Sequence, residues 1–312
     1  MNTIDNDESV DNVNSKNFKP KKKRSQWIDV WRRFRRYPIG MAGLVIVIIL
    51  FLTAIFADFI APAIYDENLG RVPVYEFQDL RNRHAPPSRE FPFGTDNFGR
   101  CIFSRVIHGS RLSLIIGFVV VAVGMTFGLI LGTIAGYYSK FVDTIIMRAM
   151  DIILAIPWIL MAIAVAAALG PGMINLMVAI GIGAIPWYAR QVRSSVLTVR
   201  EQEFVEAARA NGAGNLRIML RHILPNCMAP IMVRATMSMA TAILSAAALS
   251  FIGLGIQPPT PEWGTMLSEG RRFTRDHLPS TLFPGLAIAM VVFGINMLGD
   301  GLRDAFDPRL KQ

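Results

Sequence analysis

Long apolar runs alternate with polar and charged segments along most of this chain. Six of the runs approach or exceed the roughly 20 residues that an α-helix needs to cross the roughly 30 Å hydrocarbon layer of a bilayer. They cover residues 39–60, 112–138, 152–169, 173–189, 235–256 and 278–299, and Asp58 is their only acidic or basic residue. Backbone amides in lipid need internal partners, and runs this long do not alternate as barrel strands do. The pattern predicts an all-α integral membrane protein with six transmembrane helices.

The composition agrees with a membrane protein. Of the 312 residues, 52% are hydrophobic and 18% are charged, whereas about 25% are charged in an ordinary soluble domain. The first apolar run begins after residue 38, is too long for the apolar part of a signal peptide, and lacks a following small-residue cleavage site. We therefore expect it to be retained as a helix.

The net charge of +9 reflects basic residues beside the apolar runs rather than a soluble basic face, so nucleic acid is not expected as a partner. Residues 1–38 hold ten Lys and Arg residues. A cytosolic start and six crossings also place residues 139–151, 190–234 and 300–312 inside. Roughly two thirds of the 32 Lys and Arg residues then lie on the inner side, as the positive-inside rule requires. Both termini are predicted to be cytosolic.

The segment before the first span divides into two parts. Residues 1–20 are rich in Asn, Asp and Ser and are predicted to be disordered. In residues 25–37, Trp27, Trp31 and Phe34 follow a helical spacing with basic residues on the other face. This pattern indicates an interfacial helix on the inner leaflet, and ordinary membrane-flanking anchors are an equally good interpretation.

The predicted extracytoplasmic segment, residues 61–111, contains a tight turn within residues 93–100. A packed cap on the bundle and a binding role both remain open for it. Cys101 and Cys227 fall on opposite sides of the bilayer in this topology, so neither a disulfide nor a Cys-based metal site is expected.

Glycine and proline mark packing and bending positions within the spans. A ridge of small residues on the second span lets a neighbouring helix approach closely, and it consists of Gly124, Gly128, Gly132 and Gly136. Prolines at positions 157, 186, 279 and 284 permit kinks.

Several kinds of chemistry leave no pattern in this sequence. There is no G-x-x-x-x-G-K-[ST] nucleotide loop and no H-E-x-x-H motif, and the four histidines are scattered. We therefore predict no catalytic, cofactor or metal site, and no enzyme activity. The spans also lack the ionisable residues that proton- or voltage-driven proteins use at mid-membrane. An external energy source is expected.

The polar segment 199–225, between the fourth and fifth spans, has the pattern of two short helices. Its first helix carries the small pair Ala207 and Ala208, and Asn211 and Gly212 form a stop signal. Asn215 is predicted to cap the second helix, whose apolar stripe consists of Leu216, Met219, Leu220 and Ile223. Pro225 should end or kink this helix. The segment would form either a knob that fits a partner's groove or a loop that folds back on the bundle.

The same segment resembles a known motif. Glu206-Ala207-Ala208, followed by Gly212 and then by His222 to Pro225, is similar to the E-A-A…G…I-x-L-P motif of bacterial ABC importer permeases. Residues 93–100, 250–267 and 299–310 resemble the second, C-type permease of dipeptide and oligopeptide importers. The resemblance covers the chain apart from its N-terminal tail. It departs from the family at Cys101, where relatives often carry an acid.

The resemblance implies a type I, MetI-like bundle in the bacterial cytoplasmic membrane. A cytosolic coupling helix would transmit force from an ATPase through Glu206, Ala207, Ala208, Gly212, His222 and Pro225. The implied partners are a homologous second permease, one or two cytosolic ABC ATPases that bind the ATP, an extracytoplasmic substrate-binding protein, and membrane lipid. The chain itself would hold no cofactor.

Import of small peptides is the function that the resemblance favours. The same family pattern also serves nickel chelates, glutathione and opines, so these substrates stay open. An ion-coupled secondary carrier or channel and a membrane scaffold are alternatives from other classes. The expected organisation is a cytosolic basic tail (1–38), a first helix (39–60), an outer segment (61–111), a permease core (112–299) and a cytosolic C-terminus (300–312).

Overall fold

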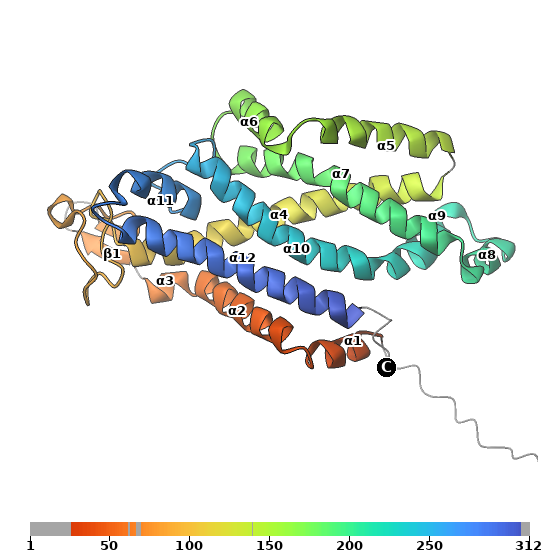
Figure 1. Cartoon of the computed structure of the whole chain (residues 1–312), viewed down its shortest axis with the longest axis horizontal. Coiled ribbons are helices and arrows are strands. Elements are labelled where there is room, and N and C mark those ends of the chain that lie inside the picture. Colours follow the sequence, from red (N-terminus) through yellow and green to blue (C-terminus); the bar gives the residue numbers. More distant parts are fainter. Residues whose placement is uncertain (1–25, 62, 67–69, 139, 307–312) are drawn as a thin grey trace, which may run out of the picture.

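The computed structural model describes residues 26–61, 63–66, 70–138 and 140–306. Its long helices lie side by side along the longest axis of the molecule (Figure 1). The predicted tail 1–20, the basic residues 21–24 and the last residues, 307–312, lie outside the described part.

Five helices in the described part are long and apolar enough to cross a membrane. They are α2 (Pro38–Ile55), α4 (Ile102–Tyr137), α7 (Met173–Arg200), the continuous helix Asn215–Phe251, and α12 (Pro279–Phe306). The continuous helix comprises α9 (Asn215–Arg217), the π-helical segment η2 (Ile218–Ile223) and α10 (Leu224–Phe251). Helices α5 (Lys140–Ala155) and α6 (Trp158–Leu169) satisfy the criterion only as a pair. The predicted all-helical membrane bundle is confirmed, with five spans, or six if this pair counts as one.

The third predicted span, residues 152–169, is not a straight helix. The axes of α5 and α6 differ by 85° across the break, and Pro157 is the residue that precedes α6. Proline lacks an N–H group and disfavours helical conformation in the residue before it, which explains a break at this point. Pro186 and Pro284 instead lie inside α7 and α12.

Most spanning helices extend beyond the apolar runs that predicted them. Helix α4 begins at Ile102 rather than at residue 112, and α7 continues to Arg200 rather than ending at residue 189. Hydropathy identifies only the part of a helix in contact with lipid, whereas backbone hydrogen bonding continues into the polar layers.

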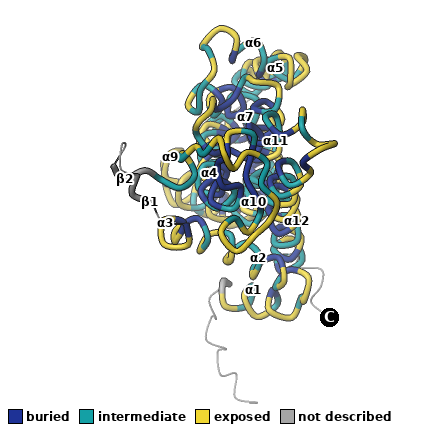
Figure 2. Tube along the Cα trace, turned by 90° about the vertical axis from the view of Figure 1, so that its left-hand side faces the viewer, coloured by how far each residue is buried: buried dark blue, intermediate teal, exposed yellow. Residues whose placement is uncertain are grey.

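The glycine ridge of α4 lies against α7. A Cβ atom added at Gly132 would lie 2.5 Å from the carbonyl oxygen of Ala189, and one at Gly136 would lie 2.8 Å from Val196 Cβ. Gly124 and Gly128 meet α7 in the same way. The two helix backbones are therefore too close for any larger side chain along this contact. Buried residues are concentrated in the middle of the bundle, exposed residues dominate α6, and α1 (Gln26–Phe34) has exposed and half-buried residues with one buried residue, Phe34 (Figure 2).

One end of the bundle, hereafter the cap end, carries short elements and loops (Figure 1). These elements are α3 (Ala57–Ile60), the antiparallel strands β1 (Ala63–Asp66) and β2 (Gly70–Pro73), η1 (Leu80–Asn82), α11 (Trp263–Gly270) and η3 (Arg271–Phe273). The predicted turn within residues 93–100 is present, with φ values of +76° at Gly94 and +73° at Gly99. Cys101, which follows it, and the distant Cys227 are buried free thiols.

Four charged side chains form a buried cluster at the cap end, hereafter the cap network: Asp96, Arg100, Arg105 and Glu269. Arg100 Nε lies 2.6 Å from Asp96 Oδ2, and Arg100 Nη2 lies 2.9 Å from Glu269 Oε2. Arg105 bonds Glu269 at 3.3 Å and the carbonyl oxygen of Pro259 at 3.0 Å. Two acids and two arginines balance one another, so the four side chains of this network carry no net charge.

Candidate coupling site

The opposite end of the bundle carries a projection, hereafter the knob, which consists of α8 (Glu203–Ala210), the turn 211–214 and α9. It lies beyond the ends of the neighbouring spans (Figure 1). Helix α1 and the end of α12 lie at this same end. Of the two short helices predicted at residues 199–225, the first is therefore present as α8, whereas the second is the start of the long helix Asn215–Phe251.

The turn of the knob depends on one glycine. Helix α8 ends where Asn211 N–H and its side-chain Nδ2 both donate to the carbonyl oxygen of Ala207, at 3.0 and 2.8 Å. Gly212 follows with φ at +78°, and Ala213 N–H donates to Ala208 at 3.1 Å. A Cβ at Gly212 would meet nothing within 4 Å. Glycine is favoured here by its left-handed backbone conformation and not by lack of space.

The predicted helix cap at Asn215 is wrong. Gly214 occupies the cap position and Asn215 is the first helical residue. Its side-chain oxygen instead accepts a 2.8 Å hydrogen bond from the hydroxyl of Tyr137, the last residue of α4. A polar contact to another helix has replaced the local cap.

The second helix does not end at Pro225. The π-helical segment η2 precedes the proline, and the N–H of Leu224 donates to the carbonyl oxygen of Met219, five residues earlier. This wider turn lets the chain continue directly into α10. It also changes which side chains are buried. Met219 and Ile223 of the predicted stripe are buried, but Leu216 and Leu220 are 65% and 57% exposed.

An apolar cluster connects the knob to the bundle. It joins Val205 of α8 to residues of α7, η2 and α10, and its buried members are Val192, Val196, Val199, Val205, Ile218, Ile223, Cys227 and Ile231. We call this cluster the knob root. Because Val205 of α8 is fully buried in this cluster, α8 is packed against the bundle and is not attached only through its loops.

Two polar contacts tie both ends of the knob segment to α4. Arg200, just before α8, donates from Nη1 to the carbonyl oxygen of Gly136 at 2.8 Å. Asn215, just after the turn, accepts the hydrogen bond from Tyr137. Gly136 and Tyr137 are consecutive residues at the end of α4, so one helix end holds both sides of the knob.

The tip of the knob presents a mixed surface. Glu206, Ala207 and Gly212 are exposed and Ala208 is half-buried. Half-buried His222 and exposed Pro225 lie on the returning helix instead. Sequence reasoning missed the exposed apolar residues Phe204, Leu216 and Leu220. The four-residue spacing of Leu216 and Leu220 is the signal that they share a face, but it does not say whether that face is buried.

Metal-ligating side chains do not gather at the knob. Across the described ranges, no group of three or more His, Cys, Asp or Glu residues is placed to hold a metal ion. The surface of α8 offers small and apolar side chains, the carboxylates of Glu203 and Glu206 and the guanidinium group of Arg209, which suit protein contact rather than covalent chemistry.

Comparison with known proteins places this geometry in a family. Residues 128–312 match the family described as "Binding-protein-dependent transport system inner membrane component", and residues 25–87 match "N-terminal TM domain of oligopeptide transport permease C".

Full-length relatives agree with this match. The dipeptide transport system permease protein DppC of Alkalihalophilus pseudofirmus is 47% identical, over 92% of this chain and 91% of the relative. The di/tripeptide transport system permease protein DppC of Pseudomonas aeruginosa is 45% identical, over 91% and 92%. The glutathione transport system permease protein GsiD of Escherichia coli O157:H7 is 47% identical, over 94% of both chains.

A solved structure shares the fold. A chain of the inward-facing MetNI methionine ABC transporter superposes with a TM-score of 0.53, covering 65% of this chain and 97% of that one, at 20% identity. The expected MetI-like bundle is confirmed. In this family ATP is handled by ATPase partners, and the description also implies a binding protein. The chain belongs to the binding-protein-dependent inner membrane components and is an OppC/DppC-type, C-type permease subunit of an ABC transporter, not itself catalytic.

Proposed function

We propose that this permease translocates dipeptides and oligopeptides that an extracytoplasmic binding protein delivers, and that cytosolic ATPases drive it through the knob. One observation carries the proposal: the knob combines an exposed tip with a buried root that joins two spanning helices, α7 and Asn215–Phe251, and packs against a third, α4. A partner that moves the tip therefore moves α7 and α10 directly, and α4 through its end.

The tip is suited to a close-fitting groove. Ala207 and Ala208 give α8 a smooth surface, and the apolar side chains of Phe204, Leu216 and Leu220 surround it. Exposed apolar residues grouped on a projection are typical of a protein interface. Glu206 adds a carboxylate for a polar contact at the edge. These features support assigning the coupling role to Glu206, Ala207, Ala208 and Gly212.

Motion of the knob has a direct route into the membrane. The second helix of the segment continues from Asn215 to Phe251 without a loop, so a shift at its start tilts the whole span. Such a two-state tilt is the usual form of domain-driven rearrangement. His222 and Pro225 lie on this helix, where they would act on its direction and not on the ATPase surface.

The orientation follows from the position of the ATPases. If the knob contacts a cytosolic enzyme, the knob end is cytosolic. Helix α1 and the end of α12 lie at the same end, which supports cytosolic termini, and the cap end is then extracytoplasmic. The basic residues around the knob agree with the positive-inside rule.

The substrate class rests on the relatives. Their names refer to dipeptides, di/tripeptides and glutathione, which are all small peptides. We therefore infer a peptide substrate. The pathway would be shared with a homologous second permease, and one or two ABC ATPases would bind on the cytosolic side. Nickel chelates and other small solutes remain the competing substrates within the same transporter class.

A matched pair of variants tests the coupling role. Gly212 and Gly214 are both exposed, and a Cβ at either meets nothing within 4 Å. They differ in backbone conformation, because only Gly212 has a positive φ. In a reconstituted complex, Gly212→Val should insert normally but hydrolyse ATP without uptake, whereas Gly214→Val should retain uptake. Normal uptake by Gly212→Val would refute the coupling role.

A separate assay tests the substrate. Labelled dipeptide, tripeptide, glutathione and nickel chelate would be offered to the wild-type complex with its own binding protein. Saturable, ATP-dependent uptake of the peptides is expected. Uptake of the nickel chelate alone would overturn the peptide assignment while leaving the coupling proposal intact.

A further inference from the structure

Helix α1 is a short helix docked beside the first span at the knob end. Its Phe34 is 2% exposed and lies where α2 meets α12. A Cβ added at Gly301 would lie 2.8 Å from the Phe34 ring, and one at Gly40 would lie 3.1 Å from it. Tyr37 is extended before Pro38, so α1 and α2 are separate helices joined by a turn. One side of α1 is thus fixed to the bundle.

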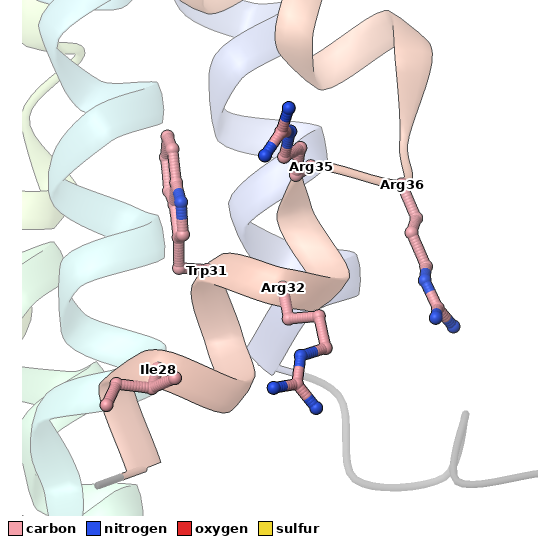
Figure 3. A pocket seen from close by; sticks show the side chains of 5 residues that line it. All are labelled: Ile28, Trp31, Arg32, Arg35 and Arg36. Carbon is pink, nitrogen blue, oxygen red and sulfur yellow. The ribbon is translucent and has the colours of Figure 1, made fainter.

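The neighbouring side of α1 is exposed and chemically mixed, and its Trp31 ring stacks on Phe34 with the ring centroids 5.8 Å apart. Ile28, Trp31, Arg32 and Arg35 fall at positions i, i+3, i+4 and i+7, which form one stripe on a helix. Ile28 and Trp31 are 55% and 54% exposed, and Arg32, Arg35 and Arg36 are also exposed. These five side chains line a hollow of about 410 Å³. Figure 3 shows Arg32 and Arg36 extending toward the same side of the helix.

The positive charge of this stripe is not neutralised within the described part of the chain. The guanidinium groups of Arg32, Arg35 and Arg36 make no ion pair or hydrogen bond with another described residue. Asp29 is the only acid in α1. The hollow therefore favours an anionic ligand that also has an apolar part to cover Trp31 and Ile28.

The position of the hollow indicates the source of that ligand. The apolar helix α2 begins at Pro38, two residues after Arg36, and Ile39 on its first turn is already exposed. Exposed apolar side chains on a spanning helix face lipid tails. The hollow therefore lies at the level of the headgroups of one leaflet, beside the first span. Arginine binds phosphate oxygens through two parallel N–H groups, and tryptophan favours the boundary between headgroups and tails.

We propose that Ile28, Trp31, Arg32, Arg35 and Arg36 form a binding site for one anionic phospholipid. Its phosphate lies beside the guanidinium groups of Arg32 and Arg36, which extend toward the same side, and Arg35 adds positive charge from the other side (Figure 3). Its glycerol and upper acyl carbons cover Trp31 and Ile28. The bound lipid holds α1 against α2 and α12 through the Phe34 contact. This site does not depend on the transported substrate or on the ATPase.

Lipid titration of the full-length chain tests the proposal. Purified chain in phosphatidylcholine nanodiscs would be compared with chain in nanodiscs that contain phosphatidylglycerol, and retained lipid counted by native mass spectrometry. We expect retention of phosphatidylglycerol and a higher Tm in its presence. The triple variant Arg32→Gln/Arg35→Gln/Arg36→Gln should lose affinity by on the order of a hundredfold, because each basic residue near an anionic surface contributes measurably.

A matched control removes the same charge elsewhere. Arg81, Arg83 and Arg89 are three exposed arginines at the cap end, and their substitution by Gln should leave phosphatidylglycerol retention unchanged. Substituting Lys for Arg32, Arg35 and Arg36 should give an intermediate affinity, because charge is kept and the paired hydrogen bonds are lost.

Several outcomes would overturn the site. They include equal loss in the control variant, full retention in the triple variant, and displacement of the lipid effect by millimolar inorganic phosphate. If the triple variant kept its lipid but lost association with the ATPase, the stripe would be a protein interface instead. The fraction of tryptophan fluorescence that brominated phosphatidylglycerol quenches should fall in Trp31→Phe, which gives an independent readout of acyl-chain contact at this residue.

Discussion

The two ends of the bundle are held by different forces. At the cap end, four buried charges at positions 96, 100, 105 and 269 bond one another and nearby carbonyl groups. At the knob end, an apolar root holds the segment, with polar contacts only at its edge. A buried charge needs its partners in place, whereas apolar contact is non-directional. The charged contacts of the cap therefore specify one arrangement. The apolar contacts of the knob root would tolerate small displacements while the knob stays attached.

Removing one charge of the cap network should have the largest effect. Arg100 is 1% exposed and bonds both Asp96 and Glu269. Arg100→Met would leave Asp96 without its close partner, and such a change costs about 3–5 kcal/mol. A large loss of Tm in detergent is expected, with α8 unaffected until global unfolding.

A paired variant sharpens this result. Asp96→Asn/Arg100→Met removes one acid and one base and leaves Arg105 with Glu269. It should be more stable than Arg100→Met alone. If the double variant were less stable than the single one, the network would not act through charge balance.

Opening the knob root should have a smaller and more local effect. Ile218 is fully buried, and truncation of a buried Ile to Ala costs about 2–5 kcal/mol. In Ile218→Ala, hydrogen exchange in α8 should accelerate while exchange in α11 stays unchanged. Leu220→Ala is the matched control, because Leu220 is 57% exposed and its truncation should barely affect stability. Equal acceleration of hydrogen exchange in α8 and α11 would show that the knob end and the cap end do not differ in how locally they open.

The edge contact between α4 and the knob should contribute less. Tyr137→Phe removes one hydrogen bond to Asn215, which is worth about 1 kcal/mol or less at an exposed site. We expect near-normal Tm but a lower ratio of uptake to ATP hydrolysis in the reconstituted complex. An unchanged ratio would show that α4 does not need this bond to follow the knob.

The smallest expected effect is a pH dependence at the cap end. Burial, and then the nearby His84, lower the pKa of His277 below its ordinary value of 6.5. Phe273 packs on His84, and a hydrogen bond with the Thr95 backbone and the charge of Asp96 act against the lowering of the His277 pKa. The folded state disfavours the charged His277 ring. The stability that neutral His277 contributes to folding is therefore fully present above pH 6.5 and decreases as the pH falls below that value.

Melting curves would measure this effect. The Tm of the wild type should fall between pH 7.5 and 5.5 by more than that of His277→Asn. Parallel curves for the two proteins would contradict the assignment of the shift to His277.

Local patterns predicted the knob better than the cap. The stop at Asn211 and Gly212 depends on a few neighbouring residues, and the sequence identifies it correctly. The cap network joins Arg100 to Glu269, 169 positions away, and no periodicity reports such a contact. The π-helical segment also divides the predicted apolar stripe, because its wider turn leaves Met219 and Ile223 buried and Leu216 and Leu220 exposed.

Proline also shows the limit of local patterns. Four positions were expected to permit kinks, yet only the break at Pro157 reorients the chain strongly, by 85°. Pro186 and Pro284 remain inside continuous helices because neighbouring spans hold those helices together. Sequence shows where a helix is weak, and packing decides whether it bends.

Helix α4 belongs to both ends. Its 36 residues span about 54 Å at 1.5 Å per residue, with Arg105 in its first turn and Tyr137 as its last residue. One helix thus contacts the cap network through Arg105 and packs against the knob root near Tyr137. In the proposed transporter, this helix would connect the two sides of the membrane directly. Thermodynamic reciprocity would then apply: if a partner bound at the knob end changed the affinity of a ligand at the cap end, that ligand would change the affinity of the partner by the same factor.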